Sequence, residues 1–481
     1  MAISSIGTIG VETAKKSFNR YHKVIGLEQL ALAKKIRQLP YKVPAGFVQP
    51  AGTDLIKDRV TISKAYSRLT ADLDKPTGIY ARGSTRDEKP GENTSIPSLF
   101  LPHDPLGSFE RYLAACNQVL QSGRDVAIIG QIMVGKPETV NGLDCIGYSN
   151  ASFVASYPSP IKRNMVTISS AAGLATKAVE ENNKSIVFHS DPEGTIKYIL
   201  WLEKQVNYEL LPEYRQKDMH VYDFNRREIV GLHESIPQHQ VFDPNRPVDP
   251  SDPCKYALSP FQKQSDIIAL NRLISQLAGI LGESIEVEGA YLNQELFLWQ
   301  TRNIPPKPYL NTIFSQLAEN TPAIISNNVL GCVNGRKDLI TITSKNPCIR
   351  CDSDAIRHFF SSQIDLLLDF FQRINKQMLF SDILLPSNIV SPLSLFGAGA
   401  DVTAVSYYGN PLSHLSGEAL QKNAEGRQMM IMHQADITGF TAANADEVIV
   451  SDEKAGIQIL LFKDVIVESD GDRAQIFLPQ R

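Results

Sequence analysis

Four side chains in the middle of the chain have the types and spacing to hold a phosphate group and its metal ion. Glu286 and Glu288 alternate along one predicted strand, and Gln300 and Arg302 alternate along the next. Alternate residues of a strand share a face, so a turn near residue 294 places Glu288 opposite Gln300 and Glu286 opposite Arg302. Mg²⁺ takes hard oxygen ligands, and arginine neutralises charge on a transferred phosphoryl group. The same pattern is also typical of a solvated hairpin face with cross-strand ion pairs.

A second candidate for chemistry is His414, within ADVTAVSYYGNPLSHLSGEAL (400–420). A predicted strand over 400–405 leads into a Gly-Asn-Pro turn, then Ser413 and His414, then a predicted helix. Free N–H groups at a helix N-terminus favour a phosphoryl group, and imidazole is a good nucleophile at neutral pH. The pattern fits a phosphate-carrying histidine or an ordinary surface histidine after a turn. His433 lies just beyond an apolar run and is interpreted as structural.

The elements that must position these residues fall into three regions. The first, about 20–305, mixes short strands and helices and contains a long polar, Pro-rich loop at 236–253. In it, 108–121 is predicted to be a helix, 125–130 a buried strand, and 285–302 a hairpin around Asn293–Gln294. The second region, about 306–381, ends in a helix over 354–379. The third returns to strands, expected at 383–385, 400–405, 429–432, 447–450 and 457–466.

Composition restricts the partners that we expect. The chain has 481 residues and a net charge of −4, so no broad basic face for nucleic acid is expected. No apolar run reaches the roughly 18 residues of a membrane helix, and the N-terminus lacks a signal pattern. Six scattered cysteines are too few for a disulfide scaffold. We therefore expect a cytoplasmic location with neither nucleic acid nor membrane as partner, whereas the oligomeric state stays undetermined.

Cys348 and Cys351 form one Cys-x-x-Cys pair, with Cys332 and His358 nearby in sequence. A structural zinc site usually shows two such pairs. The two alternatives are loop and core thiols, or a zinc-bearing interaction module.

The segment 285–302 resembles the end of the ATP-binding domain of the pyruvate phosphate dikinase and phosphoenolpyruvate synthase family. That family typically has an Asp-Ile-Glu-Trp-Ala strand followed by a strand closing in Gln-x-Arg-Pro. Here the matching pieces are Glu286-Val287-Glu288-Gly289-Ala290 and Gln300-Thr301-Arg302-Asn303. The resemblance implies that Glu288 and Gln300 are metal ligands and that Arg302 contacts phosphate.

Four other segments resemble the family and follow in its order: LPYKVPAGFV (39–48), YARGSTRDEKPGE (80–92), IIGQIMV (128–134) and VYDFNRREIVG (221–231). The second resembles the family's arginine loop, which implies that Arg82, and less closely Arg86, bind the triphosphate. The third resembles the strand that lines the adenine pocket, which implies nucleotide contacts for Gln131 and Met133. The fourth resembles the small hairpin before the terminal helix.

Two motifs depart from the family. Its Gly-Gly-Lys-Gly segment corresponds to IGLEQLALAKK (25–35), where Glu28–Gln29 take the place of the phosphate-binding lysine, and Lys34 or Lys23 is the available substitute. Its Ile-Glu-Ala-x-x-Gly-Leu-Gly segment corresponds to 168–175, which lacks the carboxylate. These departures favour a relative that binds nucleotide without turnover.

The surroundings of His414 resemble the swivelling phosphohistidine domain of the same dikinases. That domain has Gly-Gly-x-Thr-Ser-His, a helix, an inner strand and a Val-x-Val-Asp-x-x-x-Gly turn. Here Gln428–Met432 matches the inner strand and VIVSDEKAG (448–456) the closing turn, whereas Asn410, Leu412 and Leu420 replace family residues.

Together these observations predict an α/β (α+β) fold in four parts. Residues 1–20 form a tail, 21–305 a two-lobed ATP-grasp-like domain, 306–381 a helical connector and 382–481 a small swivelling β/α domain. The resemblance implies a dikinase-type phosphotransferase with ATP and Mg²⁺ as cofactors, in which Arg302 and His414 are catalytic and AMP is released. The chain ends at Arg481, short of a barrel domain, so the acceptor of the phosphate is an unidentified small molecule or a separate protein. The alternative is a catalytically degenerate, nucleotide-binding relative with a regulatory or structural role.

Overall fold

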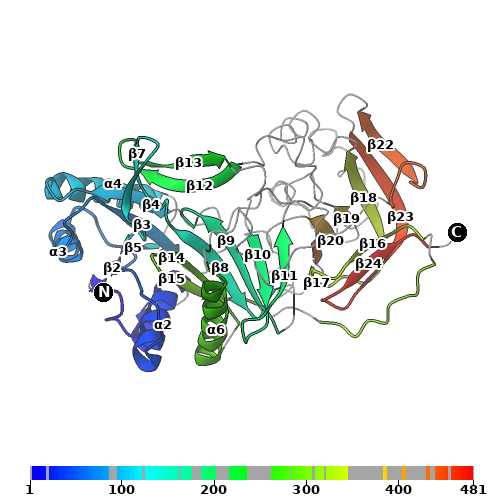
Figure 1. Cartoon of the computed structure of the whole chain (residues 1–481), viewed down its shortest axis with the longest axis horizontal. Coiled ribbons are helices and arrows are strands. Elements are labelled where there is room, and N and C mark those ends of the chain that lie inside the picture. Colours follow the sequence, from blue (N-terminus) through cyan, green and yellow to red (C-terminus); the bar gives the residue numbers. More distant parts are fainter. Residues whose placement is uncertain are drawn as a thin grey trace.

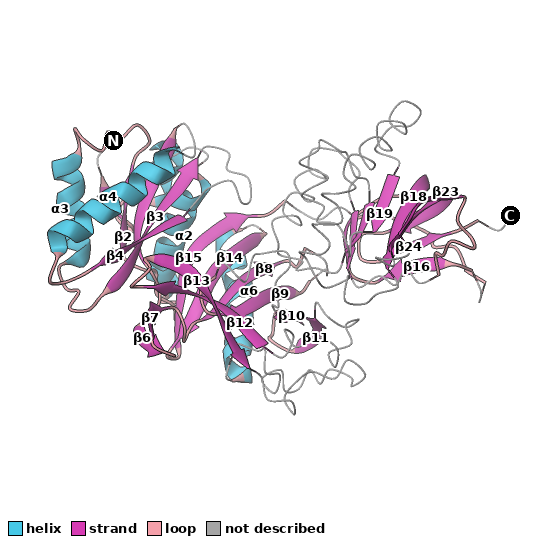
Figure 2. Ribbon diagram, turned by 90° about the horizontal axis from the view of Figure 1, so that it is seen from above, coloured by secondary structure: helices cyan, strands magenta, loops and turns pink. Residues whose placement is uncertain are grey.

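The fold is a mixed α/β structure built mostly of antiparallel sheets, which agrees with the α+β expectation (Figures 1 and 2). The computed structural model describes residues 3–17, 21–85, 95–121, 125–160, 162, 164–175, 186–201, 216–235, 261, 263–282, 284–305, 309–318, 321–344, 383–386, 404–407, 430–433, 439–452 and 457–479. No helix in these ranges is long and apolar enough to cross a membrane.

The first lobe is a five-stranded antiparallel sheet in the order β1-β2-β5-β3-β4. Its strands are β1 (Ser4–Ser5), β2 (Gly46–Gln49), β3 (Thr77–Thr85), β4 (Ser95–Phe100) and β5 (Val126–Ile132). Helices α3 (Arg59–Thr70) and α4 (Pro105–Gln121) pack one apolar core against it, in which Phe109, Leu113 and Cys116 are buried. The helix predicted over 108–121 and the buried strand predicted over 125–130 are thereby confirmed.

The expected N-terminal tail is part of this lobe. Strand β1 takes the edge of β2, and α1 (Val11–Ser17) contacts α2 (His22–Arg37). The buried Glu28 carboxylate of α2 accepts the backbone N–H groups of Gly7 at 2.7 Å and Gly10 at 3.0 Å. A buried carboxylate needs such partners. The segment 3–17 therefore packs against α2 and supplies the hydrogen-bond donors that Glu28 needs.

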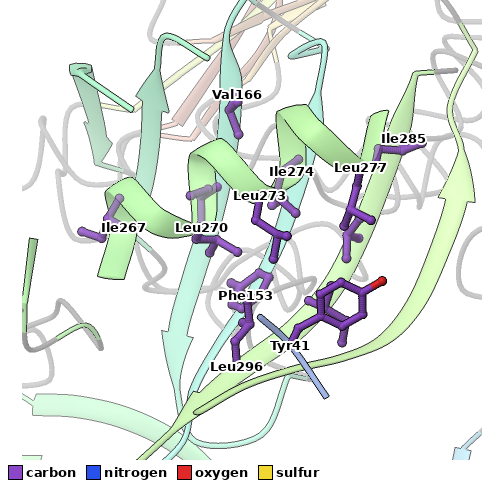
Figure 3. Close-up of a cluster of buried hydrophobic side chains, with 14 of the residues drawn as sticks. Tyr41, Phe153, Val166, Ile267, Leu270, Leu273, Ile274, Leu277, Ile285 and Leu296 are labelled. Carbon is purple, nitrogen blue, oxygen red and sulfur yellow. The ribbon is translucent and has the colours of Figure 1, made fainter. Parts of the chain in front are cut away.

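A six-stranded antiparallel sheet follows, in the order β11-β10-β9-β8-β14-β15. Its strands are β8 (Ala151–Tyr157), β9 (Val166–Ala172), β10 (Ile186–Ser190), β11 (Ile196–Trp201), β14 (Ile285–Leu292) and β15 (Glu295–Asn303). Helix α6 (Gln264–Leu281) lays Ile267, Leu270, Ile274 and Leu277 on one face, at helical spacing (Figure 3). Gly282, at φ +72°, ends the helix.

The opposite face of the six-stranded sheet carries polar side chains in register. Thr167, Ser156, Glu286 and Arg302 form one row across β9, β8, β14 and β15. A parallel row contains Ser169, Val154, Glu288 and Gln300. The apolar face of the sheet therefore packs on α6, and the polar face carries the side chains that could bind a ligand or take part in a reaction.

A small sheet in the order β13-β12-β7-β6 lies beside the two larger ones. It contains β6 (Pro137–Val140), β7 (Leu143–Ile146), β12 (Gln216–Asp223) and β13 (Glu228–Ser235). Strands β12 and β13 pair antiparallel from Gln216–Ser235 to Asp223–Glu228, which confirms the hairpin at 221–231. The loop expected at 236–253 lies outside the described residues.

The C-terminal half forms a mixed sheet in the order β16-β24-β23-β18-β19-β20-β21-β17, with β22 paired to β23. Its strands are β16 (Ala323–Ser326), β17 (Val329–Gly331), β18 (Gly335–Ser344), β19 (Ile383–Pro386), β20 (Ala404–Tyr407), β21 (Met430–His433), β22 (Glu447–Asp452), β23 (Ile457–Ser469) and β24 (Ala474–Phe477). The four strands from β18 to β21 are parallel neighbours, and the other pairs are antiparallel.

This sheet corrects the expected boundary at 381. Residues 323–344, which the sequence pattern places in a helical connector, supply β16, β17 and β18 to the same sheet and core as β23 and β24. Their apolar side chains, such as Ile324, Val329 and Leu339, need this core for burial. The helix expected over 354–379 lies outside the described residues.

An extended segment, 309–318, precedes this sheet and is bound to it. Both the N–H and the hydroxyl of Ser315 donate to the Glu468 carboxylate, at 2.7 and 2.5 Å. Gln475 Nε2 donates to Ser315 O at 3.0 Å, and Thr312 Oγ1 donates to Ser469 O at 2.6 Å. The segment is therefore an added layer on the β23–β24 turn.

Candidate functional site

The β14–β15 hairpin sets the register of the candidate site. Asn293 and Gln294 form a two-residue turn with φ values of +52° and +66°, the left-handed pair that a tight hairpin requires. Glu288 pairs with Gln300 and Glu286 pairs with Arg302. Both predicted cross-strand pairings are confirmed.

A bulge in β15 brings a further residue to the site. The register shifts between Glu288 and Gly289, which leaves Trp299 without a partner of its own on β14. Trp299 Nε1 and Gln300 Nε2 then both donate to the Glu288 carboxylate, at 3.3 and 2.8 Å. An irregularity of this kind re-aims side chains beside functional sites, and here it directs two neighbouring donors at one carboxylate.

Arg82 reaches this hairpin from the first lobe. Its Nη2 donates to Gln300 Oε1 at 2.6 Å, and its Nη1 donates to Trp299 O at 3.2 Å. The Glu288 carboxylate is 3.9 Å from Nη2. Gln300 therefore lies between the guanidinium and the carboxylate, with its amide oxygen on the cation and its amide N–H on the anion. We call Arg82, Gln131, Glu288, Trp299 and Gln300 the inter-lobe network.

Gln131, for which the family resemblance implies a nucleotide contact, bonds to two protein groups in the structure. Its side chain is buried, its Oε1 accepts from Arg82 Nη1 at 3.0 Å, and its Nε2 donates to Pro44 O at 3.3 Å. Both ends of the amide are thus used within the protein. In this conformation the Gln131 side chain orients Arg82.

Met133 belongs to an apolar cluster where three sheets meet, which we call the junction cluster. Its buried members are Leu99, Met133, Ile146, Leu174 and Tyr222, and its partly exposed members are Tyr80, Leu101, Phe224 and Ile229. Tyr80 and Arg82 are two residues apart on β3 and so share a face. The junction cluster therefore adjoins the inter-lobe network along one strand.

Glu286 and Arg302 form an ion pair between Arg302 Nη2 and Glu286 Oε1. The Glu286 side chain is 7% exposed and that of Arg302 is 23% exposed, so the carboxylate lies beneath the guanidinium. Burial raises the pKa of Glu286, and the neighbouring Glu288 adds to that effect, while Arg302 opposes it. Part of the Arg302 side chain therefore remains accessible to solvent.

The oxygen set fits a magnesium ion in its chemistry. Glu288 supplies a carboxylate whose side chain is 20% exposed, and Gln300 supplies an amide oxygen that accepts from Arg82. Mg²⁺ commonly combines one or two protein oxygens with phosphate oxygens and water. In the described residues no group of three or more His, Cys, Asp or Glu is placed to hold a metal. For Gln300 to be a ligand, its Oε1 must turn from Arg82 toward the ion.

The two candidate substitutes for the family lysine differ in position. Lys23, in the first turn of α2, donates through Nζ to Gly83 O at 3.1 Å, directly beside Arg82. Lys34 lies about three turns further along the same helix. Glu28, at the aligned place, is buried in its bonds to Gly7 and Gly10. Of the two lysines, Lys23 is therefore the one near the network.

Several predicted residues lie outside the described ranges: Arg86, Cys348, Cys351, His358 and His414. Cys332 is described, and it is buried next to Val333 of the C-terminal core. Sequence reasoning missed Trp299, because a bulge leaves no periodic signal. It also missed Asn150, which lies in a turn without a motif.

Comparison of the sequence with models of protein families and with curated proteins found no match.

Proposed function

We propose that this chain is an ATP-dependent phosphotransferase of the dikinase type, with an ATP-grasp-like N-terminal half and a phosphate-carrying C-terminal half. The observation that carries the proposal is the contact between Arg82 and Gln300. These residues are 218 positions apart and come from separate sheets, yet their side chains bond at 2.6 Å, with Glu288 beside them. A cation, a carboxylate and an amide oxygen gathered between two lobes match the demands of a magnesium-bound triphosphate.

The junction cluster supports the same function. Nucleotide sites combine an apolar surface for the base with convergent polar groups for the phosphates. Here the apolar side chains around Tyr80 and the charged side chains around Arg82 adjoin on one face of β3. A nucleotide would then bind with its base at the junction cluster and its phosphates at the inter-lobe network.

Each residue of the site then has a distinct role. Arg82 and Arg302 offset phosphate charge, and Lys23 adds a third positive group beside Arg82. Glu288 and Gln300 hold Mg²⁺, which neutralises charge that develops on the phosphate oxygens. Gln131 and Glu286 fix the orientations of Arg82 and Arg302. Cytoplasmic location and an acceptor supplied as a small molecule or a separate protein complete the proposal.

His414 is the proposed phosphate carrier. His414 itself lies outside the described residues, and the support for its role is the resemblance of 400–420 to the phosphohistidine domain of the dikinases. In the proposed step an imidazole nitrogen of His414 attacks the β-phosphorus, the N–P bond forms, and AMP leaves with the oxygen that bridged the α- and β-phosphates. The histidine then carries the β- and γ-phosphates together, and attack of water or inorganic phosphate on the γ-phosphorus breaks the β–γ bridge and leaves phosphohistidine.

Incubation with ATP labelled at the β-phosphate tests the carrier. We expect AMP and an acid-labile labelled protein from the parent chain, and neither from His414→Ala. ATP binding should stay nearly unchanged in that variant, because the network lies on other elements. Formation of ADP that is unaffected by the variant would instead indicate a simple kinase or ATPase.

One observation favours a second candidate, a nucleotide-binding relative without turnover. Glu28 stands where the family has its phosphate-binding lysine, and its carboxylate is committed to Gly7 and Gly10. The buried Ser169 likewise stands where the family has a carboxylate. Nucleotide binding with neither AMP nor ADP formed would support this candidate, whose role is then regulatory or structural.

A further inference from the structure

Asn150 directly precedes β8. Its backbone N–H, its backbone oxygen and its side-chain Nδ2 are hydrogen-bonded, whereas, among the described residues, its side-chain Oδ1 is not. Its backbone N–H donates to Gly147 O at 3.0 Å, and its backbone oxygen accepts from the Gly173 N–H at 2.9 Å. Its Nδ2 donates to Val134 O at 2.9 Å. The residue is 4% exposed, and within the described residues its Oδ1 has no hydrogen-bond partner.

A buried amide oxygen without a partner is uncommon, because the lost hydrogen bond to water costs about 1–3 kcal/mol. Turning the amide over would not solve the problem, since Val134 O would then face the Oδ1 atom instead of a donor. The Val134 bond therefore fixes Oδ1 as an acceptor. The described residues therefore supply no donor to this acceptor, which leaves it available to a donor of a bound ligand.

The position of Asn150 indicates what kind of group supplies that donor. Two of the residues that bond to Asn150 are chain neighbours of the junction cluster. Val134 follows Met133, and Gly173 precedes Leu174. Gly173 has φ +86°, and an added Cβ would lie 2.4 Å from His220 O, which makes this close approach specific to glycine. The unpartnered oxygen thus belongs to a residue that is held next to the largely buried apolar side chains of the junction cluster.

We propose that Asn150 selects the base of the nucleotide, with Oδ1 accepting a hydrogen bond from the exocyclic amino group of a 6-aminopurine. This inference rests on the proposed nucleotide binding at the inter-lobe network. A 6-oxopurine presents an acceptor at the same position, and two acceptors facing each other leave both unbonded. Because the amide cannot turn over, Asn150 discriminates between the two bases.

Calorimetric titration with Mg-ATP and Mg-ITP tests the inference, because inosine differs from adenosine in having oxygen in place of the 6-amino group. In the parent chain we expect ATP to bind at least about tenfold more tightly, the equivalent of one hydrogen bond. Asn150→Ala should bind the two nucleotides within about twofold of each other. Ser152→Ala is the matched control, since it removes a buried bond of 2.6 Å to Gly173 O near the same site and should keep the preference.

The outcomes separate the two proposals. Equal affinity of the parent for ATP and ITP would overturn the role of Asn150 and leave nucleotide binding standing, with Oδ1 meeting a water molecule. Retention of the ATP preference in Asn150→Ala would overturn it as well. Failure to bind either nucleotide would overturn the proposed function and the inference with it. The parent comparison does not depend on whether a variant folds.

Discussion

Arg82 and Gln300 bond at 2.6 Å across the boundary between the first lobe and the β14–β15 hairpin. The Gln300 amide bonds in turn to Glu288 at 2.8 Å. A buried guanidinium and a carboxylate are thereby joined through a neutral amide rather than by direct contact. This arrangement keeps both charges satisfied while leaving the carboxylate partly exposed to a ligand.

Replacement of Gln300 by leucine should destabilise the protein. It removes one partner from Arg82 and one from Glu288, and a buried charged group that loses a partner costs about 1–3 kcal/mol or more. Urea unfolding measures the change. Glu295→Gln on the same hairpin is the control, because Glu295 and its partner Lys42 are about half exposed and such pairs contribute less than about 1 kcal/mol. Equal effects would contradict the role of the buried amide.

Two helical glycines should respond differently to replacement by alanine. At Gly26 of α2 an added Cβ would lie 2.1 Å from Thr301 O of β15, so Gly26→Ala must push the helix from the sheet. We expect a loss of about 1–3 kcal/mol. At Gly279 of α6 nothing lies within 4 Å of an added Cβ, and Gly279→Ala should be neutral or stabilising by up to about 1 kcal/mol. Thermal unfolding of the two variants compares them directly.

Acidification should loosen the extended segment 309–318 from the C-terminal sheet. Burial raises the pKa of Glu468, but the hydrogen bonds from the Ser315 hydroxyl, the Ser315 N–H and Gln475 together outweigh it, so the pKa is lowered. A carboxylate with a lowered folded-state pKa stabilises the fold above its unfolded pKa, and that contribution is lost as pH falls through the folded pKa. The Ser315 amide resonance should therefore shift as the pH falls below the range in which an ordinary glutamate carboxyl titrates. The shift should be absent in Glu468→Gln, and its persistence there would assign it to another group.

The hairpin and its partners were predictable because their signals are local. Strand alternation and a turn of two residues fix which side chain faces which, so Glu288–Gln300 and Glu286–Arg302 followed from sequence. The bulge at Trp299 was not predictable, since the extra residue is set by packing across the sheet. The role of Gln131 also escaped, because its partner Arg82 lies on a strand 49 positions away.

The boundary at 381 failed for a similar reason. Strands β16 to β18 are separated in sequence from β23 and β24, and only the completed sheet shows that they share one core. The tail at 1–20 was misassigned because Glu28 gave no sign in the sequence of its bonds to Gly7 and Gly10. Non-local pairing leaves little trace in local periodicity.

The most direct test of the central claim is calorimetric titration of the parent chain with ATP, in the presence and absence of Mg²⁺, beside Glu288→Gln. The variant removes one negative charge and keeps an oxygen that accepts from Gln300 Nε2, so the fold should persist. We predict magnesium-dependent binding by the parent and binding that is weaker and less dependent on magnesium in the variant. No heat of binding to the parent at millimolar ATP, or a variant that binds as the parent does, would contradict the assignment of the inter-lobe network as a magnesium–ATP site.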